Sequence, residues 1–262
     1  MLKIREYVKA QSLSEAYELN QKKGNVILGG MLWMKLQNRN VGTAIDLSGL
    51  GLDAIEETEE EFRIGAMVTL RQLEQHVGLN AYTQNAVKDA FRHIVGVQFR
   101  NCATVGGSVF GRFGFSDVIP LLLAMDSYVE LYRGGIVPME TFVREGAPGD
   151  ILVHVIIRKK SMKLSYQCQR NARTDFPVLN CAVSLREDTY FCVVGARPGR
   201  AVIFQDEQGI LKRGITAESA ECFGAYVQEQ VITGSNMRAG AEYRKKITGV
   251  LAKRALLAIQ QM

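Results

Sequence analysis

The sequence has no pattern of cysteines or histidines that would build a disulfide framework or hold a metal. None of its five cysteines forms a C-x-x-C pair, and they are widely spaced, at Cys102, Cys168, Cys181, Cys192 and Cys222. The three histidines are equally scattered and have no obvious nucleophile as a neighbour: His76, His93 and His154. We therefore expect free thiols in a reducing compartment, no metal site and a cytoplasmic location. His154 stands within a strand pattern and is predicted to be a hydrogen-bonded sheet residue.

Long apolar runs and a dominant charge are also missing. The most apolar stretch, Val118–Met125, is far too short to cross a bilayer, and Met1–Glu6 lacks the apolar region of a signal peptide. The 32 basic residues exceed the 27 acidic ones by only five, and they are spread along the chain. A nucleic-acid binder more often gathers them in one stripe. Neither a membrane nor a nucleic acid is expected as a partner.

What is present is an ordinary globular composition. Of the 262 residues, 47% are apolar and 23% are charged, which excludes a disordered or collagen-like chain. This length predicts one large domain or two small ones, with enough chain to bury a core without a disulfide or metal.

Periodicity and capping residues predict a mixture of strands and helices. Capping-box spacing at Ser12 and Glu15, and again at Thr69 and Gln72, predicts two helix starts. Apolar runs predict strands at residues 25–28, 43–47, 61–66, 128–132 and 151–158, and helical spacing predicts helices at 85–94 and from 116 or 117 to 125. Because the order lacks a steady βαβ rhythm, the predicted class is α+β.

The pattern of predicted elements changes after the polar run 158–161, where we place a domain boundary. Four strands at 163–170, 178–186, 190–195 and 201–204 predict a meander, with a hairpin turn at Glu187-Asp188. Two helices at 217–229 and 239–260 are predicted to follow.

Two glycine clusters are the most informative features. Gly29-Gly30 ends the apolar strand at 25–28, and Gly106-Gly107 stands between the hydroxyl residues Thr104 and Ser108. Because glycine lacks a Cβ, such loops let main-chain N–H groups converge on a phosphate. Either pair alone predicts only a tight turn at a strand end. Two such loops together favour a diphosphate site, although no P-loop pattern follows Gly106.

Four other side chains could contact a ligand, and each also has a purely structural explanation. Asp117 precedes an apolar run and is equally suited to start a helix or to contact a ligand. Arg100 and Arg112 flank the second glycine cluster, and for Arg100 a solvated surface position is expected. Trp33 is expected to pack, with stacking on a ligand ring as the alternative.

Taken in order, six stretches resemble one known family, the FAD-binding (medium) subunit of the xanthine dehydrogenase and carbon monoxide dehydrogenase group of molybdenum hydroxylases. Leu28–Met31 resembles the family's A-G-G-T loop. Arg63–Ala66 resembles its R-I-G-A strand, and Leu70–Leu73 resembles the helix that follows it. The family pattern Q-I-R-N-x-A-T-I-G-G-N matches 98–108, and S-D-x-x-P-x-L-L-A-L-D-A matches 116–127. A looser match to D-x-R-G-S-x-x-Y-R covers 236–244. The resemblance extends over nearly the whole chain.

The resemblance implies a fold and a cofactor. The fold is an FAD-binding domain of the vanillyl-alcohol-oxidase (PCMH) type over 1–160, with subdomains of about 1–55 and 56–160, followed by a small α+β flavoprotein C-terminal domain over 161–262. The cofactor is FAD, lying between the two subdomains. Its diphosphate would be wrapped by the loop made of Val26, Ile27, Leu28, Gly29, Gly30, Met31, Leu32 and Trp33.

The resemblance also implies further contacts with the cofactor. The diphosphate and flavin would meet Thr104, Val105, Gly106, Gly107 and Ser108. Asp117 would contact the ribityl or adenosine side, Ile94 and Leu152 would pack on the cofactor, and Gln167 would lie near the flavin. No residue is expected to be catalytic, and no metal is expected.

Three positions depart from the family pattern. Met31 replaces a usual Thr or Ser, which removes one hydroxyl–phosphate bond worth about 1 kcal/mol. Ser108 replaces a frequent Asn. Gly111–Phe115 replaces a small-residue segment that contains proline, which alters the flavin edge and affects the expected electron acceptor; Arg112 there could place a positive charge near the flavin.

The function that the resemblance implies is electron transfer. A molybdenum–pterin subunit would oxidise the substrate, a subunit with two [2Fe–2S] clusters would relay single electrons, and FAD in this chain would pass them to NAD+ as hydride. The alternatives are a non-catalytic assembly or maturation module with the same fold, and a stand-alone flavin oxidoreductase.

Overall fold

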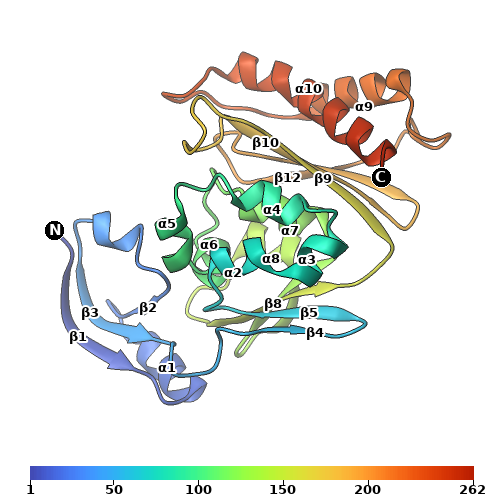
Figure 1. The fold of residues 1–262 in the computed structure, drawn as a ribbon. Helices are drawn as coiled ribbons and strands as arrows, with labels where there is room; N and C mark the ends of the chain where they lie inside the picture. The colour runs from blue at the N-terminus through green and yellow to red at the C-terminus, as the bar shows by residue number, and fades with distance from the viewer. The chain divides into compact units, whose positions relative to one another are not determined.

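The computed structural model describes all 262 residues and confirms the α+β class. The chain divides into two compact units, one made of residues 1–72, 97–111 and 127–158, the other of 73–96, 112–126 and 159–262. The second unit therefore contains two segments, 73–96 and 112–126, that come before residue 159 in the sequence. The division into domains at residue 160 stays a prediction. Figure 1 shows the elements in chain order.

The first unit begins with a small parallel sheet in the order β1-β3-β2, formed by β1 (Lys3–Lys9), β2 (Val26–Leu28) and β3 (Asn40–Asp46). Helix α1 (Leu13–Asn20) lies between β1 and β2 in the sequence and begins as predicted, with the Ser12 hydroxyl accepting the N–H of Glu15 at 3.1 Å. Apolar residues of the helix and of the strands, such as Ala16 and Ile45, share one core. The sheet places the end of β2, and with it Gly29-Gly30, at a fixed point on the unit.

A five-stranded antiparallel sheet completes the first unit. Its order is β4-β5-β8-β6-β7, formed by β4 (Ile55–Glu57), β5 (Glu61–Gly65), β6 (Ser127–Leu131), β7 (Gly135–Pro138) and β8 (Leu152–Arg158). The accompanying helices are α5 (Val97–Cys102), α6 (Val105–Phe110) and α8 (Met139–Glu145). Helix α2 (Leu70–Gln75) carries the chain out of this unit and starts with the predicted capping box, since Thr69 and Gln72 bond reciprocally.

The second unit contains the predicted meander. The order β12-β11-β10-β9 is formed by β9 (Met162–Gln169), β10 (Leu179–Arg186), β11 (Thr189–Gly195) and β12 (Val202–Gln205). The hairpin turn between β10 and β11 falls at Glu187-Asp188, as predicted, and Glu187 has a φ of 53°.

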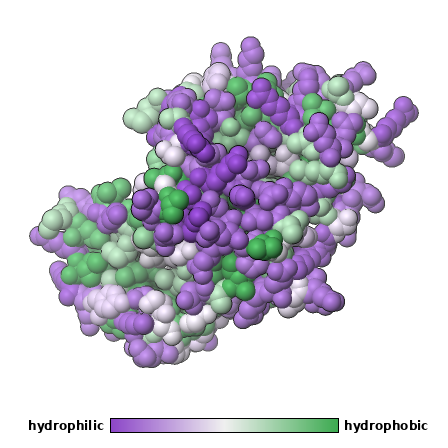
Figure 2. All heavy atoms as spheres, viewed as in Figure 1, coloured by the Kyte–Doolittle hydropathy of each residue, from purple (hydrophilic) through white to green (hydrophobic).

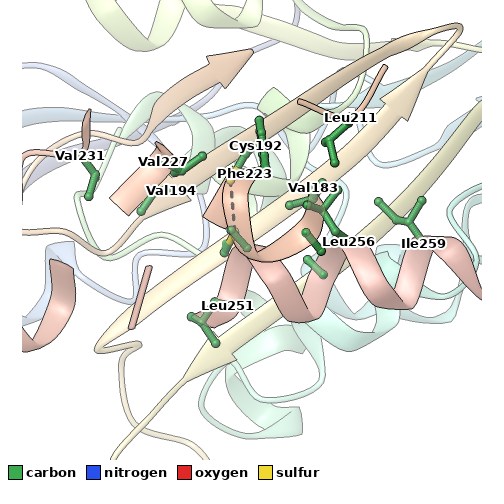
Figure 3. Packing of buried hydrophobic residues seen from close by; sticks show 14 of the residues in the cluster. Val183, Cys192, Val194, Leu211, Phe223, Val227, Val231, Leu251, Leu256 and Ile259 are labelled. Carbon is green, nitrogen blue, oxygen red and sulfur yellow. Dashed lines mark hydrogen bonds between the residues drawn. The ribbon is translucent and has the colours of Figure 1, made fainter. Parts of the chain in front are cut away.

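Helices cover both faces of this meander. Alternate residues of β10 and β11, among them Val183 and Val194, pack into one apolar cluster with α9 (Ala217–Gln230) and α10 (Ala241–Gln260) (Figure 3). The residues between them face α7 (Val118–Ala124), where the Ser184 hydroxyl donates to the carbonyl of Ala124 at 2.5 Å. The same unit contains α3 (Val77–Tyr82) and α4 (Ala86–Phe91).

Four short helices, α3, α5, α6 and α8, were not among the elements that periodicity predicts. Each has only six or seven residues, too few for a clear apolar stripe. Helix α6 also contains Gly106-Gly107, which disfavours a helix by about 1 kcal/mol per residue. Tertiary contacts override that preference, as described below. None of the helices is both long and apolar enough to span a membrane.

Candidate functional site

The loop after β2 offers a run of unused main-chain donors. None of the N–H groups of Gly29, Gly30, Met31 and Leu32 donates a hydrogen bond within the chain, and these residues are only partly buried. Met31 has a φ of 58°, in the left-handed region that residues with a side chain seldom adopt. A left-handed residue among right-handed or extended ones turns successive N–H groups toward one side, the arrangement that binds anions.

The two glycine clusters lie against each other. The sequence predicted only that both would contribute to one diphosphate site. A Cβ on Gly29 would lie 2.8 Å from the Thr104 hydroxyl and 3.3 Å from the Cα of Gly107. A Cβ on Gly30 would overlap the carbonyl oxygen of Cys102, at the end of α5. Only glycine permits this approach, so both positions are required by packing as well as by any ligand.

The second cluster is the start of helix α6, not an open loop. The Thr104 hydroxyl accepts the N–H of Gly107 at 3.1 Å, and the N–H groups of Val105 and Gly106 donate to the carbonyls of Val68 and Ala66. These main-chain donors are therefore already in use within the chain. Contact of Thr104–Ser108 with a cofactor stays a prediction.

The segment after the free N–H groups is apolar. The 3₁₀ turn Met34–Leu36 ends in Leu36, which is 72% exposed, and the Trp33 ring packs edge-on against Phe99 at 5.9 Å, as expected for a packing role. Figure 2 shows apolar side chains at the surface over the part of the molecule that carries β1–β3. Exposed apolar groups beside unused N–H groups suit a ligand with an anionic part and an apolar part.

Arg100 and Leu152 are the remaining candidate residues of this unit. Arg100 is only 4% exposed, so the expected solvated position is wrong: α5 packs its inner face into the unit and takes the guanidinium with it. Leu152 is buried at the start of β8, the strand against which α6 packs. Its contact with a cofactor stays a prediction.

In the second unit, Asp117 is the centre of a buried polar network. Its Oδ1 accepts from the Tyr166 hydroxyl at 2.5 Å, from the Arg170 guanidinium at 2.6 Å and from the Asn180 amide at 3.3 Å, while no hydrogen bond reaches Oδ2. The helix cap comes from Ser116 instead, whose hydroxyl accepts the N–H of Ile119 at 3.1 Å. Asp117 therefore occupies the N-cap position of α7, as predicted, but the capping bond comes from Ser116, the other predicted cap. Ligand contact of Asp117 stays a prediction, with one carboxylate oxygen left to make it.

Burial in this network changes the acidity of its neighbours. Burial, and then the charge of Asp117, raises the pKa of Tyr166 well above its usual value and that of Cys168 to about 12. At neutral pH both groups are therefore protonated, and Tyr166 acts as a donor to Asp117. Burial alone would lower the pKa of Arg170, but the charge and hydrogen bond of Asp117 together with Cys168 and Tyr166 outweigh it, and the pKa of Arg170 is raised.

Tyr166, Arg170 and Asn180 were not predicted as site residues from the sequence. Tyr166 and Asn180 alternate with apolar residues along β9 and β10, a pattern typical of ordinary half-buried strands. The one available signal was Arg170 at the end of a buried strand, since a buried arginine requires an acidic partner.

The remaining predicted residues of this unit are placed as follows. Ile94 follows α4 and is partly buried, and Gln167 lies on β9 opposite Cys181, with its amide 3.5 Å from the Ser165 hydroxyl. Arg112 begins the departing segment with a φ of 44° and is partly buried. The roles of Ile94 and Gln167 toward a cofactor stay predictions.

The other titratable groups are engaged in structure. His154 bonds through Nδ1 to Glu130 at 2.6 Å, and Glu130 also pairs with Arg63 across β5, β6 and β8, so the prediction of a satisfied sheet histidine is confirmed. All five cysteines are free thiols. No group of three or more histidine, cysteine, aspartate or glutamate side chains is arranged to hold a metal ion.

Known proteins share this fold and part of this sequence. A relative from Escherichia coli strain K12, the uncharacterized protein YgfM, is 24% identical over 254 residues, which are 95% of this chain and 93% of the relative. Carbon monoxide dehydrogenase from Hydrogenophaga pseudoflava, in a form that lacks the Mo-pyranopterin moiety of its molybdenum cofactor, contains a chain of the same fold. The TM-score is 0.88 at 21% identity, covering 98% of this chain and 97% of that one.

Quinoline 2-oxidoreductase from Pseudomonas putida 86 contains another chain of this fold, with a TM-score of 0.84 at 17% identity, covering 100% of this chain and 97% of that one. The profile of the family described as the FAD binding domain in molybdopterin dehydrogenase matches residues 2–159, more than half of the sequence. The chain therefore belongs to this family of FAD-binding domains of molybdopterin dehydrogenases, and its cofactor is FAD.

Proposed function

We propose that this chain is the electron-transfer subunit of a molybdenum hydroxylase. Electrons would arrive from the [2Fe–2S] clusters of a partner subunit, which receives them from a molybdopterin subunit, and would leave through FAD to NAD+. The family membership supports the proposal, and so do two proteins with chains of the same fold, a carbon monoxide dehydrogenase and a quinoline 2-oxidoreductase. Xanthine dehydrogenase-like use of NAD+ is the finer part of the proposal.

The residues present fit FAD. The four free N–H groups of Gly29–Leu32 are suited to a diphosphate, because main-chain donors in a nest satisfy anionic oxygens without a cationic side chain. This run of unused donors is the single observation that carries the assignment. In the other unit, Oδ2 of Asp117 is available to accept from a cofactor hydroxyl, and its position is fixed by three donors on Oδ1.

When bound, FAD supplies a two-electron store that accepts electrons singly and returns two of them with one proton to NAD+ as a hydride. The chain's own residues bind and orient. The glycine approach between β2 and α6 shapes the cradle, and the Asp117 carboxylate is held in place by the buried guanidinium of Arg170.

The test is a visible spectrum of the purified full chain, followed by anaerobic addition of NADH. The proposal predicts a flavin spectrum with about one FAD per chain, bleached by NADH. A chain that holds FAD but is not bleached by NADH would contradict NAD+ as the acceptor. A chain that stays colourless with excess FAD would contradict the redox function and favour the assembly module.

A further inference from the structure

Helices α9 and α10 cover one face of the meander sheet and run side by side in opposite directions. A Cβ on Gly224 would lie 2.6 Å from the carbonyl oxygen of Gly249, so the two helices touch near their middles. The Gln260 amide at the end of α10 donates to the carbonyl of Ile215, just before α9, at 2.7 Å. The pair is therefore antiparallel, and its inner face packs on the sheet through the apolar cluster of Figure 3.

The opposite face of this pair carries one stripe of exposed residues on each helix. Along α9 the exposed residues recur at intervals of four, three and four, which keeps them on one side of the helix: Glu218, Cys222, Ala225 and Glu229. Along α10 the intervals are three, four and four: Tyr243, Lys246, Val250 and Arg254. We call these eight residues the outer stripes.

The two helices carry opposite charges. Helix α9 contains three glutamates and no lysine or arginine, whereas α10 contains five basic residues and one glutamate. Between the helices, Glu221 and Lys253 form an ion pair. The charged residues of the outer stripes form no ion pair within the chain. They are therefore available to a second molecule.

The outer stripes are complementary to themselves. An acidic stripe and a basic stripe, each about 16 Å long over eleven residues, lie next to each other. A two-fold axis along the helices would place α9 of a second copy on α10 of the first, and the reverse. An axis across the helices would instead place α9 on α9, with glutamates facing glutamates. Opposite charges therefore select the first arrangement.

The register between the copies follows from the register within the chain. Because the axis runs along the helices, each residue of α9 meets the part of the second copy's α10 that lies at its own height. The Glu221–Lys253 pair fixes these heights. Glu229 is eight residues beyond Glu221 and lies level with residue 245, which is next to Lys246. The first glutamate of the α9 stripe to be placed thus has a basic residue of the second copy within reach.

The rest of the stripe follows the same register. Glu218 lies level with residue 256, two residues and about 3 Å along the helix from Arg254. Between the charged ends, Ala225 lies level with residue 249, next to Val250, which is 42% exposed. A small apolar centre between charged ends is typical of an interface between proteins.

We propose that two copies of this chain associate through the outer stripes, α9 on α10, in a dimer with two-fold symmetry. A different partner would need an acidic and a basic stripe at the same separation and height, whereas a second copy already has both. The inference goes beyond the proposed function and does not depend on it.

The test is analytical ultracentrifugation of the full chain over a range of concentrations. The wild type should dimerise, and its Kd should rise at least about tenfold between about 0.05 M and 0.5 M ionic strength. E218K/E229K makes both stripes basic and K246E/R254E makes both acidic, so each variant alone should dimerise at least about tenfold more weakly. An equimolar mixture of the two variants should form a heterodimer about as tight as the wild-type dimer, because every basic stripe then meets an acidic one.

Two matched controls change the net charge by the same amounts at exposed positions outside the stripes. They are E59K/E60K, between β4 and β5, and K22E/K23E, after α1. Both should dimerise like the wild type. If a double stripe variant does not fold, E229K and K246E replace the two double variants in the same comparison.

A wild-type chain that stays monomeric at every concentration overturns the inference and leaves the outer stripes to a different partner chain. A dimer whose Kd is unchanged in both stripe variants also overturns it, because such a dimer uses another face. The same holds for a mixture of the folded variants that stays monomeric. None of these outcomes bears on FAD binding or on the electron acceptor, so the proposed function stands or fails separately.

Discussion

The two units build their polar features from different groups. In the first unit they are main-chain N–H groups of Gly29–Leu32, with no arginine or lysine among those four residues. In the second unit they are side chains, with Asp117 accepting from Tyr166, Arg170 and Asn180. A main-chain cradle depends on backbone shape, and a side-chain network depends on charge.

This difference predicts what each region tolerates. Charge substitutions should leave the cradle intact, whereas a single added methyl group should destroy it. The Asp117 network should respond in the opposite way, because it depends on the paired charges of Asp117 and Arg170.

The largest effect is expected from Gly30→Ala. Its Cβ would overlap the carbonyl oxygen of Cys102, and neither backbone can yield without moving β2 or α5. We expect a loss of at least about 3 kcal/mol in the free energy of unfolding, together with loss of FAD. Chemical denaturation and flavin content measure both.

Gly240→Ala is the control, because a Cβ there meets nothing within 4 Å and the φ of −76° suits alanine. It should cost less than about 1 kcal/mol. If Gly30→Ala and Gly240→Ala change stability and flavin content equally little, the close approach of Gly30 to Cys102 does not shape the cradle.

Asp117→Asn should be the next most harmful change. It removes the charge that compensates Arg170, whose side chain is only 9% exposed, at a cost of about 3 kcal/mol. FAD affinity should also fall, since Oδ2 is lost as an ionised acceptor. Tyr166→Phe, which removes one donor to Oδ1 and leaves the charge, should cost about 1 kcal/mol and keep FAD affinity. If both variants bind FAD like the wild type, Asp117 is purely structural.

Thiol reactivity provides a smaller, local readout. Only Cys102 and Cys222 are exposed, and the pKa of about 12 keeps Cys168 protonated at pH 8. A thiol reagent should therefore modify two cysteines in the native chain and five after unfolding. FAD should slow the reaction of Cys102, whose carbonyl contacts Gly30, and leave Cys222 on α9 unaffected. Protection of Cys222 instead would place the cofactor elsewhere.

The smallest expected effect is that of Met31→Gly. The left-handed φ of 58° strains methionine but not glycine. Relief of this strain is offset by the greater freedom of glycine in the unfolded chain and by the loss of the Met31 side chain from the cluster of Leu28, Val41 and Ala44. We expect a change of less than about 1 kcal/mol in the free energy of unfolding, with FAD still bound. A loss of FAD would show that the Met31 side chain itself contributes to the cradle.

The sequence revealed most of the architecture because its strands and long helices have clear periods. The capping pairs at Ser12 and Thr69, the meander after 161 and the turn at Glu187-Asp188 all follow from local chemistry. Helix α6 does not, because its two glycines disfavour a helix and only contacts with Ala66 and Gly29 reveal why they are there.

The site was predictable to a similar extent. Gly29-Gly30 and Asp117 could be singled out by residue type and by resemblance. The partners of Asp117 lie on or directly after strands more than 45 residues away and reach it only through tertiary folding. Nothing local in the sequence marks such long-range convergence.

The most direct test is an FAD titration of the apo chain, run side by side on the wild type, Gly30→Ala and Gly240→Ala. We expect about one FAD per chain with the same Kd for the wild type and Gly240→Ala, and no uptake by Gly30→Ala, because the cofactor depends on the cradle. A wild-type chain that never takes up FAD, or a Gly30→Ala chain that binds it like the wild type, would contradict the cradle as the FAD site.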